Sequence, residues 1–298
     1  MNTIAGHTMG TPGMSVPDAL RLFRDAGLDA AEIVWQDGYA CGLPENDGHH
    51  TLAAVEAASR ELGVPVCALT PYMTAINSLD EREREHDLER FRRCLQDASR
   101  LGASAIRVYA GSLTDPADER HAEKWSRLVE SLRELGPEAR SLGTTLVVEN
   151  HFSTMTVCAG ETGRLMREVA DAGGIGILYD QANLAFTHCE DYSEAIPLQA
   201  PWIRHVHVKD LVFTNPDAEF KAAAVSRVGE DERAVRSRVV GEGILDWPAI
   251  LSSLDAVGYH GVLSLEYEYR WHPQDLPAPA EGFVRSALAL RQMLETIS

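Results

Sequence analysis

Residues 145–151 read TLVVENH, a short run of β-branched and apolar residues that ends in a carboxylate, an amide and an imidazole. Such a run is typical of a buried strand. An unpaired carboxylate inside a protein costs far more free energy than packing returns. We therefore expect Glu149 to lie at the carboxyl end of this strand, next to a group of opposite charge.

The same unit recurs along the chain, because seven other short apolar runs are each followed by a segment with helical periodicity. These runs are TIAG (3–6), AAEIVW (30–35), VPVCALT (64–70), AIRVYAG (105–111), GIGILYD (174–180), IRHVHVKD (203–210) and GVLSLEYE (261–268). One helical segment follows Ser15, a good N-cap, and stops at Gly27. Eight strand-then-helix units in 298 residues predict an α/β fold, a closed (β/α)8 TIM barrel, as a single domain over residues 1–298.

Composition and charge limit the classes of partner. The hydrophobic fraction of 45% is sufficient for a large core. The formal net charge of −18 would repel a phosphate backbone, so we expect no nucleic acid partner. No run of about 18 apolar residues suggests a membrane span, and the first residues, MNTIAGHTMG, lack the pattern of a secretion signal. We expect a cytoplasmic protein without a membrane partner.

The cysteines are scattered, odd in number and without a CxxC pair. This pattern argues against a disulfide framework and against a thiolate zinc site. We expect every cysteine to be a reduced packing residue, since free cysteine is often buried. The five are Cys41, Cys67, Cys94, Cys158 and Cys189.

One segment breaks the regular spacing. Residues 211–240, after the seventh strand, are long, charged and mostly polar. In this architecture a segment that follows a strand lies over the active face, so residues 211–240 are a candidate lid. A surface excursion without a role in the site is the alternative.

Side chains on a strand alternate in direction, so sequence parity predicts which of them point into the barrel. The polar inward residues on the last four strands are Glu149, Asp180, His205, His207, Lys209, Ser264, Glu266 and Glu268. Four of these, one from each strand, fall near the carboxyl ends, where the active sites of such barrels lie. They are Glu149, Asp180, His207 and Glu266.

Three carboxylates that converge without a countercharge repel one another, and a divalent cation relieves that repulsion. Three oxygen ligands and one nitrogen ligand suit Mn²⁺ best, with Mg²⁺, Co²⁺, Fe²⁺ and Zn²⁺ as alternatives. Taken singly, each of the four residues is more often structural than a ligand. Their position on successive strands favours one metal ion held by Glu149, Asp180, His207 and Glu266.

Three motifs support a family resemblance over nearly the whole chain. They are VVEN (147–150), HVHVKD (205–210) and GEGILDWPAILSSLDAVGYHGVLSLE (241–266). With them the chain resembles the xylose isomerase-like barrel superfamily, the sugar phosphate isomerase/epimerase group, which includes ketose 3-epimerases, inosose isomerases and inosose dehydratases. The resemblance implies the same four metal ligands. It also implies a homo-oligomer, a dimer or a tetramer.

Two departures from that pattern affect the expected substrate contacts. Many relatives have D-x-x-H after the sixth strand, whereas this chain reads DQAN and places Asn183 at the histidine position. Epimerases of the group often carry an arginine shortly after the metal histidine, and here the sequence is KDLVFTN. The ketose 3-epimerase subgroup is therefore not specifically indicated.

The expected activity is metal-dependent isomerisation or epimerisation of a sugar or cyclic polyol ketone through an enediolate. Glu149 and Glu266 are the candidate base and acid on the two faces of one carbon, and His151 is a candidate proton shuttle at the pocket rim. The candidate substrate-binding residues are Lys209, Asn183, Arg107 and His7. His205 is expected in a supporting or core position, and Glu32 points inward by parity.

The same site allows other outcomes. An enediolate that expels a β-substituent would make the protein a lyase, either an inosose-type dehydratase or a C-glycoside deglycosidase that acts on a 3-keto-glycoside. A less favoured alternative is a DNA-repair enzyme like endonuclease IV, which binds three metals in a basic groove. A barrel that binds without catalysis is the remaining alternative.

Overall fold

The computed structural model describes residues 2–47, 49–115, 117–215 and 233–297. Within these ranges, eight parallel strands close into a barrel, because β1 pairs with both β11 and β2. They are β1 (Thr3–His7), β2 (Ala30–Trp35), β4 (Val66–Pro71), β5 (Ala105–Val108), β6 (Thr145–Glu149), β7 (Ile175–Asp180), β8 (Ile203–Val208) and β11 (Val262–Leu265). Short β3 (Gly42–Leu43) extends the sheet beside β2. The predicted TIM barrel is confirmed, and each of its eight strands overlaps the run predicted for it.

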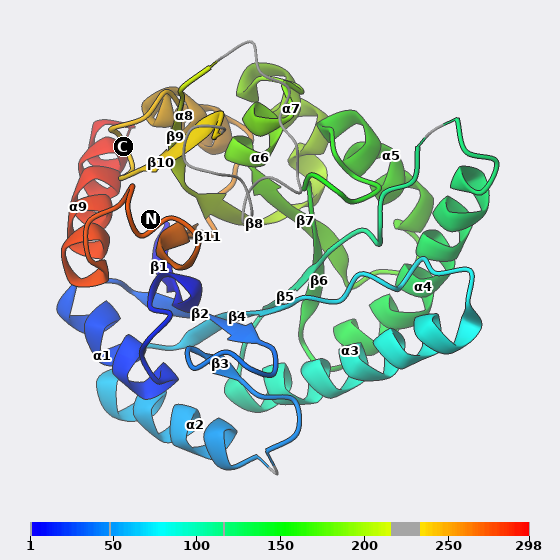
Figure 1. Cartoon of the computed structure of the whole chain (residues 1–298), viewed down its shortest axis with the longest axis horizontal. Coiled ribbons are helices and arrows are strands. Elements are labelled where there is room, and N and C mark those ends of the chain that lie inside the picture. Colours follow the sequence, from blue (N-terminus) through cyan, green and yellow to red (C-terminus); the bar gives the residue numbers. More distant parts are fainter. Residues whose placement is uncertain (1, 48, 116, 216–232, 298) are drawn as a thin grey trace.

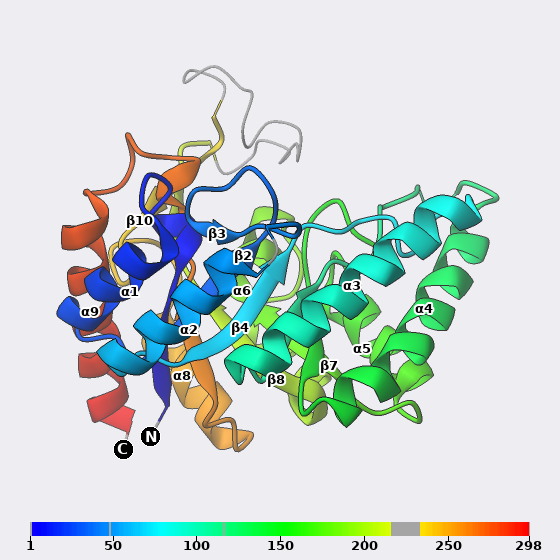
Figure 2. The same ribbon diagram turned by 90° about the horizontal axis from the view of Figure 1, so that it is seen from below.

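Helices surround the barrel, as Figure 1 shows in a view into the ring of strands. They are α1 (Val16–Asp25), α2 (His50–Leu62), α3 (Glu81–Leu101), α4 (His121–Ser141), α5 (Ala159–Val169), α6 (Gln181–Phe186), α7 (Tyr192–Gln199), α8 (Trp247–Ala256) and α9 (Pro279–Ile297). Ser15 caps α1 by accepting a hydrogen bond from the Asp18 backbone N–H, as its sequence predicts. In Figure 2, α3 and α4 lie on one flank and both chain ends on the opposite flank. None of the helices in the described ranges has the length and apolar composition to cross a membrane.

The apolar core has two layers, as strand alternation requires. The larger layer lies between the strands and the helices and includes Leu146, Val148, Val206 and Val208. The smaller layer fills the barrel interior with mostly small side chains, namely Ala5, Ala30, Cys67, Ala68, Ala105, Val147 and Leu178. These residues close the interior, so polar side chains gather above them, toward the carboxyl ends of the strands.

The two ends of the segment after β8 pair with each other as a two-stranded antiparallel ribbon. β9 (Asp210–Phe213) pairs with β10 (Val235–Arg238), and residues 216–232 of the candidate lid lie outside the described residues. The Asp210 carboxylate accepts hydrogen bonds from the backbone N–H groups of Leu211, Gly241, Gly243 and Leu245. A Cβ atom at Gly243 would lie 2.0 Å from Asp210 Oδ1, so only glycine fits there. This packing fixes the base of the segment, and its role as a lid stays a prediction.

The expectation that every cysteine is reduced is wrong for two of them. Cys158 and Cys189 form a disulfide, with their Cα atoms 5.6 Å apart, although 31 positions separate them in the chain. The physical reason is that β6 and β7 are neighbours, so the loops that follow them lie side by side. Glu190 joins the same two loops by accepting hydrogen bonds from the N–H groups of Ala159 and Gly160. The expectation is correct for Cys41, Cys67 and Cys94, which are free and buried.

Because Cys158 and Cys189 are joined, we expect three free thiols in the folded protein. Alkylation of the denatured, unreduced protein should label three cysteines, and the same reaction after reduction should label all five. Replacing Cys158 and Cys189 together with serine should lower the free energy of unfolding by about 3 kcal/mol, since the bond no longer restricts the unfolded chain. Mass spectrometry and urea denaturation provide the two measurements. Five labelled cysteines before reduction would contradict the bond.

Candidate metal centre

Three carboxylates and an imidazole meet at the carboxyl ends of four consecutive barrel strands. Glu149 ends β6, Asp180 ends β7, His207 lies on β8 and Glu266 follows β11. All four side chains are buried, and one ligand-type atom from each lies within 4.8 Å of the others. His207 Nδ1 is 3.4 Å from Glu266 Oε2, 3.5 Å from Glu149 Oε1 and 3.8 Å from Asp180 Oδ2. The structure thus brings together the quartet that parity selected.

The charges of this cluster act on one another at short range. Burial, only partly offset by the Lys209 ammonium, and the negative charge of Glu266 raise the pKa of Asp180 to about 6. Burial disfavours the Glu149 carboxylate, yet the fields of His151 and His207 outweigh burial and bring its pKa down to about 2. Burial also lowers the pKa of His207, but nearby carboxylates raise it well above its usual value. The cluster therefore attracts positive charge.

Buried atoms without a hydrogen bond show that the quartet fits a cation. Glu149 Oε2, Asp180 Oδ2 and His207 Nδ1 have no hydrogen-bond partner among the described residues. Asp180 Oδ2 does lie 2.9 Å from Lys209 Nζ, so its charge is paired although no hydrogen bond is formed. Buried polar atoms are normally satisfied, and orphaned ones call for an unseen ligand or ion. Three carboxylates and one imidazole are a donor set that suits a divalent ion.

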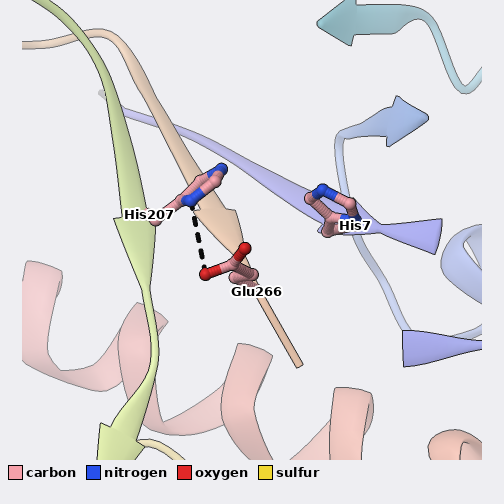
Figure 3. Close-up of side chains that lie close together, drawn as sticks. All are labelled: His7, His207 and Glu266. Carbon is pink, nitrogen blue, oxygen red and sulfur yellow. Dashed lines mark ion pairs between the residues drawn. The ribbon is translucent and has the colours of Figure 1, made fainter. Parts of the chain in front are cut away.

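A second group of possible metal ligands consists of His7 on β1, His207 and Glu266. Figure 3 shows these three side chains, with the His207–Glu266 ion pair as a dashed line. The nitrogens of His7 are already engaged. Its Nδ1 accepts a hydrogen bond from the Met9 N–H at 3.0 Å, and its Nε2 lies 3.0 Å from Thr70 Oγ1. Burial lowers the pKa of His7 to about 4, so the ring is neutral. The predicted contact of His7 with substrate stays a prediction.

Lys209 and Asn183 connect the carboxylates of the quartet. Lys209 Nζ donates to Glu266 Oε2 at 2.7 Å and to Asn183 Oδ1 at 3.1 Å. Asn183 in turn donates from Nδ2 to Glu149 Oε1 at 3.0 Å. Lys209 Nζ also lies 2.9 Å from Asp180 Oδ2, so it pairs with two carboxylates of the quartet, and its predicted contact with substrate stays a prediction. Asn183 is held in the first turn of α6, where its backbone N–H donates to Oδ1 of the N-cap residue Asp180 at 2.9 Å.

A cavity of about 210 Å³ opens beside the quartet. Its lining consists of Met9, Tyr72, Arg107, Tyr109, His151, Phe152, Lys209, Glu266, Glu268 and Trp271. Arg107 is buried, with its guanidinium 4.4 Å from the Tyr72 ring and 4.2 Å from the Tyr109 ring. Its Nη1 lies 3.6 Å from Glu149 Oε2, which ties the wall of the cavity to the quartet. His151 lies beside Tyr109, with ring centroids 4.7 Å apart.

Parity gave the direction of Glu32 but not its depth. Glu32 points inward as expected, yet it does not line the cavity. It lies deeper in the barrel, against His205 and His207. The alternation of side chains on a strand separates the two faces of a sheet, and depth depends on strand register, which the sequence does not show. The cavity wall also includes Trp271, in the segment EYEYRWHP (266–273) after the last strand, whose sequence suggests an aromatic wall over the site. Tyr72, which follows β4, also lines the cavity, and no motif signals it.

These features define a (β/α)8 barrel with a polar centre at the carboxyl ends of its strands, the usual place for a barrel active site. The chain belongs to the Xylose isomerase-like TIM barrel family, whose model matches residues 20–293.

Curated relatives and solved structures agree with that membership. The chain is 32% identical to the inosose dehydratase of Geobacillus thermodenitrificans over 176 residues, which cover 58% of this chain and 55% of that protein. It is 30% identical to the inosose dehydratase of Clostridium perfringens over 146 residues, 49% of this chain and 48% of that protein. The chain thus spans about half the length of the curated relatives it matches.

Among solved structures, a D-tagatose 3-epimerase-like protein superposes with a TM-score of 0.74 at 18% identity, covering 99% of this chain and 98% of its own. The probable 3-DHS dehydratase AsbF from Bacillus anthracis superposes with a TM-score of 0.74 at 17% identity, covering 97% and 98%. At these identities the superpositions show a common fold.

Proposed function

We propose that the chain is a divalent-metal-dependent enzyme that removes a proton from the carbon next to the carbonyl of a neutral sugar or cyclic polyol. The convergence of Glu149, Asp180, His207 and Glu266, with three of their buried atoms lacking a hydrogen bond, supports this proposal. These four residues would hold the ion, and Mn²⁺ suits their mixed oxygen and nitrogen donors. When bound, the ion would supply Lewis acidity that stabilises the negative charge of an enediolate.

The proton transfers belong to the two glutamates. Glu149 Oε1 accepts the Asn183 hydrogen bond, whereas Oε2 has no hydrogen-bond partner among the described residues and lies 3.6 Å from Arg107 Nη1. Oε2 would take a proton from the substrate carbon. Glu266 enters from β11, and Lys209 holds its carboxylate. Return of a proton by Glu266 to the opposite face would give the epimer, and His151, which lines the cavity, would relay protons.

The balance of charge supports an uncharged substrate. Among the described residues, the quartet contains the carboxylates of Glu149, Asp180 and Glu266, and Glu268 adds a fourth carboxylate in the cavity lining. A divalent ion with Lys209 and Arg107 would supply four positive charges in return. Because no excess positive charge is left to bind a phosphate or a carboxylate, we expect a neutral keto-polyol. Lys209 and Arg107 would then donate hydrogen bonds to hydroxyl or carbonyl oxygens.

A lyase is the second candidate, because the curated relatives are named inosose dehydratases. The first step is the same proton abstraction. In elimination the electron pair of the broken C–H bond forms a C=C bond while the β-carbon loses its hydroxyl group, which leaves as water after gaining a proton. The sequence also allows a C-glycoside deglycosidase acting on a 3-keto-glycoside.

One experiment tests proton abstraction and separates these outcomes. The Mn²⁺-loaded protein is incubated in D₂O with an inosose, a free ketose and a 3-keto-glycoside, each followed by NMR and mass spectrometry. We expect deuterium to enter the carbon next to the carbonyl of at least one of them. An epimer containing deuterium indicates an isomerase, and loss of water or of an aglycone indicates a lyase. Equal exchange by chelator-treated protein would contradict the metal-dependent mechanism.

A further inference from the structure

A buried carboxylate contacts His207 on the side opposite the metal centre. Glu32 is fully buried on β2, which is separated from β8 in the sheet by β1 and β11. Its side chain therefore reaches across the barrel interior. Glu32 Oε1 lies 3.1 Å from His207 Nε2, and Glu32 Oε2 lies 2.9 Å from His205 Nε2. One carboxylate thus joins two imidazoles of the same strand.

The two nitrogens of His207 have different surroundings. Nε2 contacts Glu32, whereas Nδ1 faces the carboxylates of the quartet at 3.4–3.8 Å and has no hydrogen-bond partner among the described residues. A neutral imidazole carries one N–H, and the hydrogen bond at one nitrogen sets which nitrogen can bind a metal. A proton on Nδ1 would be attracted to the quartet and would block the lone pair. An acceptor at Nε2 opposes that arrangement.

We propose that Glu32 is a positioning residue of the metal centre, which accepts the Nε2–H of His207 and so directs the Nδ1 lone pair toward Glu149, Asp180 and Glu266. This inference rests on the metal-dependent function proposed above. Carboxylates that hold metal-binding histidines in this way also increase the basicity of the ligand. Glu32 does not line the cavity, and its hydrogen-bond partners are His205 and His207, so it would act on the metal centre through His207.

His205 and His7 restrict the position of Glu32. The His205 contact at 2.9 Å engages the second carboxylate oxygen, which prevents rotation of the group about its axis. His7 Nε2 lies 3.9 Å from Glu32 Oε1 and adds a third imidazole nearby. A buried carboxylate is costly unless it is hydrogen-bonded, and two N–H donors satisfy this one. The support of His207 is therefore rigid.

The test is Glu32→Gln, which keeps the size of the side chain. A glutamine oxygen can accept from one imidazole, but its NH₂ group would face the N–H of the other. We expect the dissociation constant for Mn²⁺ to rise by about 10–100-fold. In Zn²⁺-loaded protein with ¹⁵N-labelled histidine, the Nε2–H proton of His207 should lose its strong downfield shift. A purely structural role for Glu32 would not move that signal.

Two further variants keep the inference testable. Asp97→Asn is the matched control, because Asp97 is a buried carboxylate on α3 that accepts a hydrogen bond from Trp35 Nε1 outside the centre. It should leave the Mn²⁺ affinity unchanged. His205→Gln removes the imidazole that contacts Glu32 Oε2, and it should weaken Mn²⁺ binding by less than Glu32→Gln does. If Glu32→Gln does not fold, the Mn²⁺ affinity of His205→Gln still tests the role of Glu32.

The outcomes separate this inference from the proposed function. Unchanged Mn²⁺ affinity and an unchanged His207 signal in Glu32→Gln would overturn the role of Glu32 and leave the function standing. Equal loss of affinity in Asp97→Asn would also overturn it, since the effect would then be general destabilisation. Tight Mn²⁺ binding by the wild-type protein without turnover of any keto-polyol would reject the function, while the comparison of affinities would still test Glu32.

Discussion

Glu149→Gln is expected to lower the rate of proton exchange on the substrate by about 10³-fold while the protein remains folded. General acid–base catalysis by a positioned side chain contributes about 10²–10⁴-fold, and glutamine cannot accept the proton. The amide oxygen can still accept the Asn183 hydrogen bond, so the local packing is kept. The measurement is deuterium incorporation from D₂O into the keto-polyol that the wild-type protein turns over.

The control for that result is Glu61→Gln, on the exposed face of α2, which should have wild-type activity. Circular dichroism of both variants checks the fold. More than about a tenth of wild-type exchange in Glu149→Gln would remove Glu149 from the role of base, since the loss would then be smaller than general-base catalysis contributes.

His207→Ala is expected to weaken Mn²⁺ binding by more than about 100-fold, because loss of a group that merely supports a ligand already costs about 10–100-fold. His207 is the nitrogen donor of the quartet, and its removal leaves three carboxylates, with Lys209 beside Asp180 and Glu266 and Arg107 beside Glu149. The variant also leaves Glu32 Oε1 without its imidazole partner, so the free energy of unfolding should fall by about 1–3 kcal/mol.

Equilibrium dialysis with Mn²⁺ and urea denaturation measure these two effects. His260→Ala is the matched control, because His260 is half exposed and its nearest acidic partner is Asp255 on the surface. It should bind Mn²⁺ as the wild-type protein does. Wild-type affinity in His207→Ala would place the ion elsewhere.

The barrel could be predicted from the sequence because each strand is a short apolar run bounded by turn residues. The direction of each side chain could also be predicted, since successive side chains on a strand point either into the barrel or toward the helices. The same alternation identified Glu149, Asp180, His207 and Glu266, since parallel strands in a barrel end on one face. The structure brings the four together, and their role as ligands stays a prediction.

Contacts that depend on depth or on loops could not be predicted in this way. His7 faces inward, but its ring nitrogens contact Met9 and Thr70. The Thr70 contact depends on the registers of β1 with β2 and of β2 with β4, which the sequence does not show. The Cys158–Cys189 bond depends on how two neighbouring loops fold. Asn183 lies where the family resemblance implies a histidine, and its bridge between Lys209 and Glu149 required coordinates.

The most direct test of the metal centre is a manganese anomalous difference map from crystals of the Mn²⁺-loaded protein. We predict one peak per chain, in contact with Glu149, Asp180, His207 Nδ1 and Glu266. A peak at any group of side chains that does not include His207 would contradict the assignment. So would a map without any peak among the four side chains.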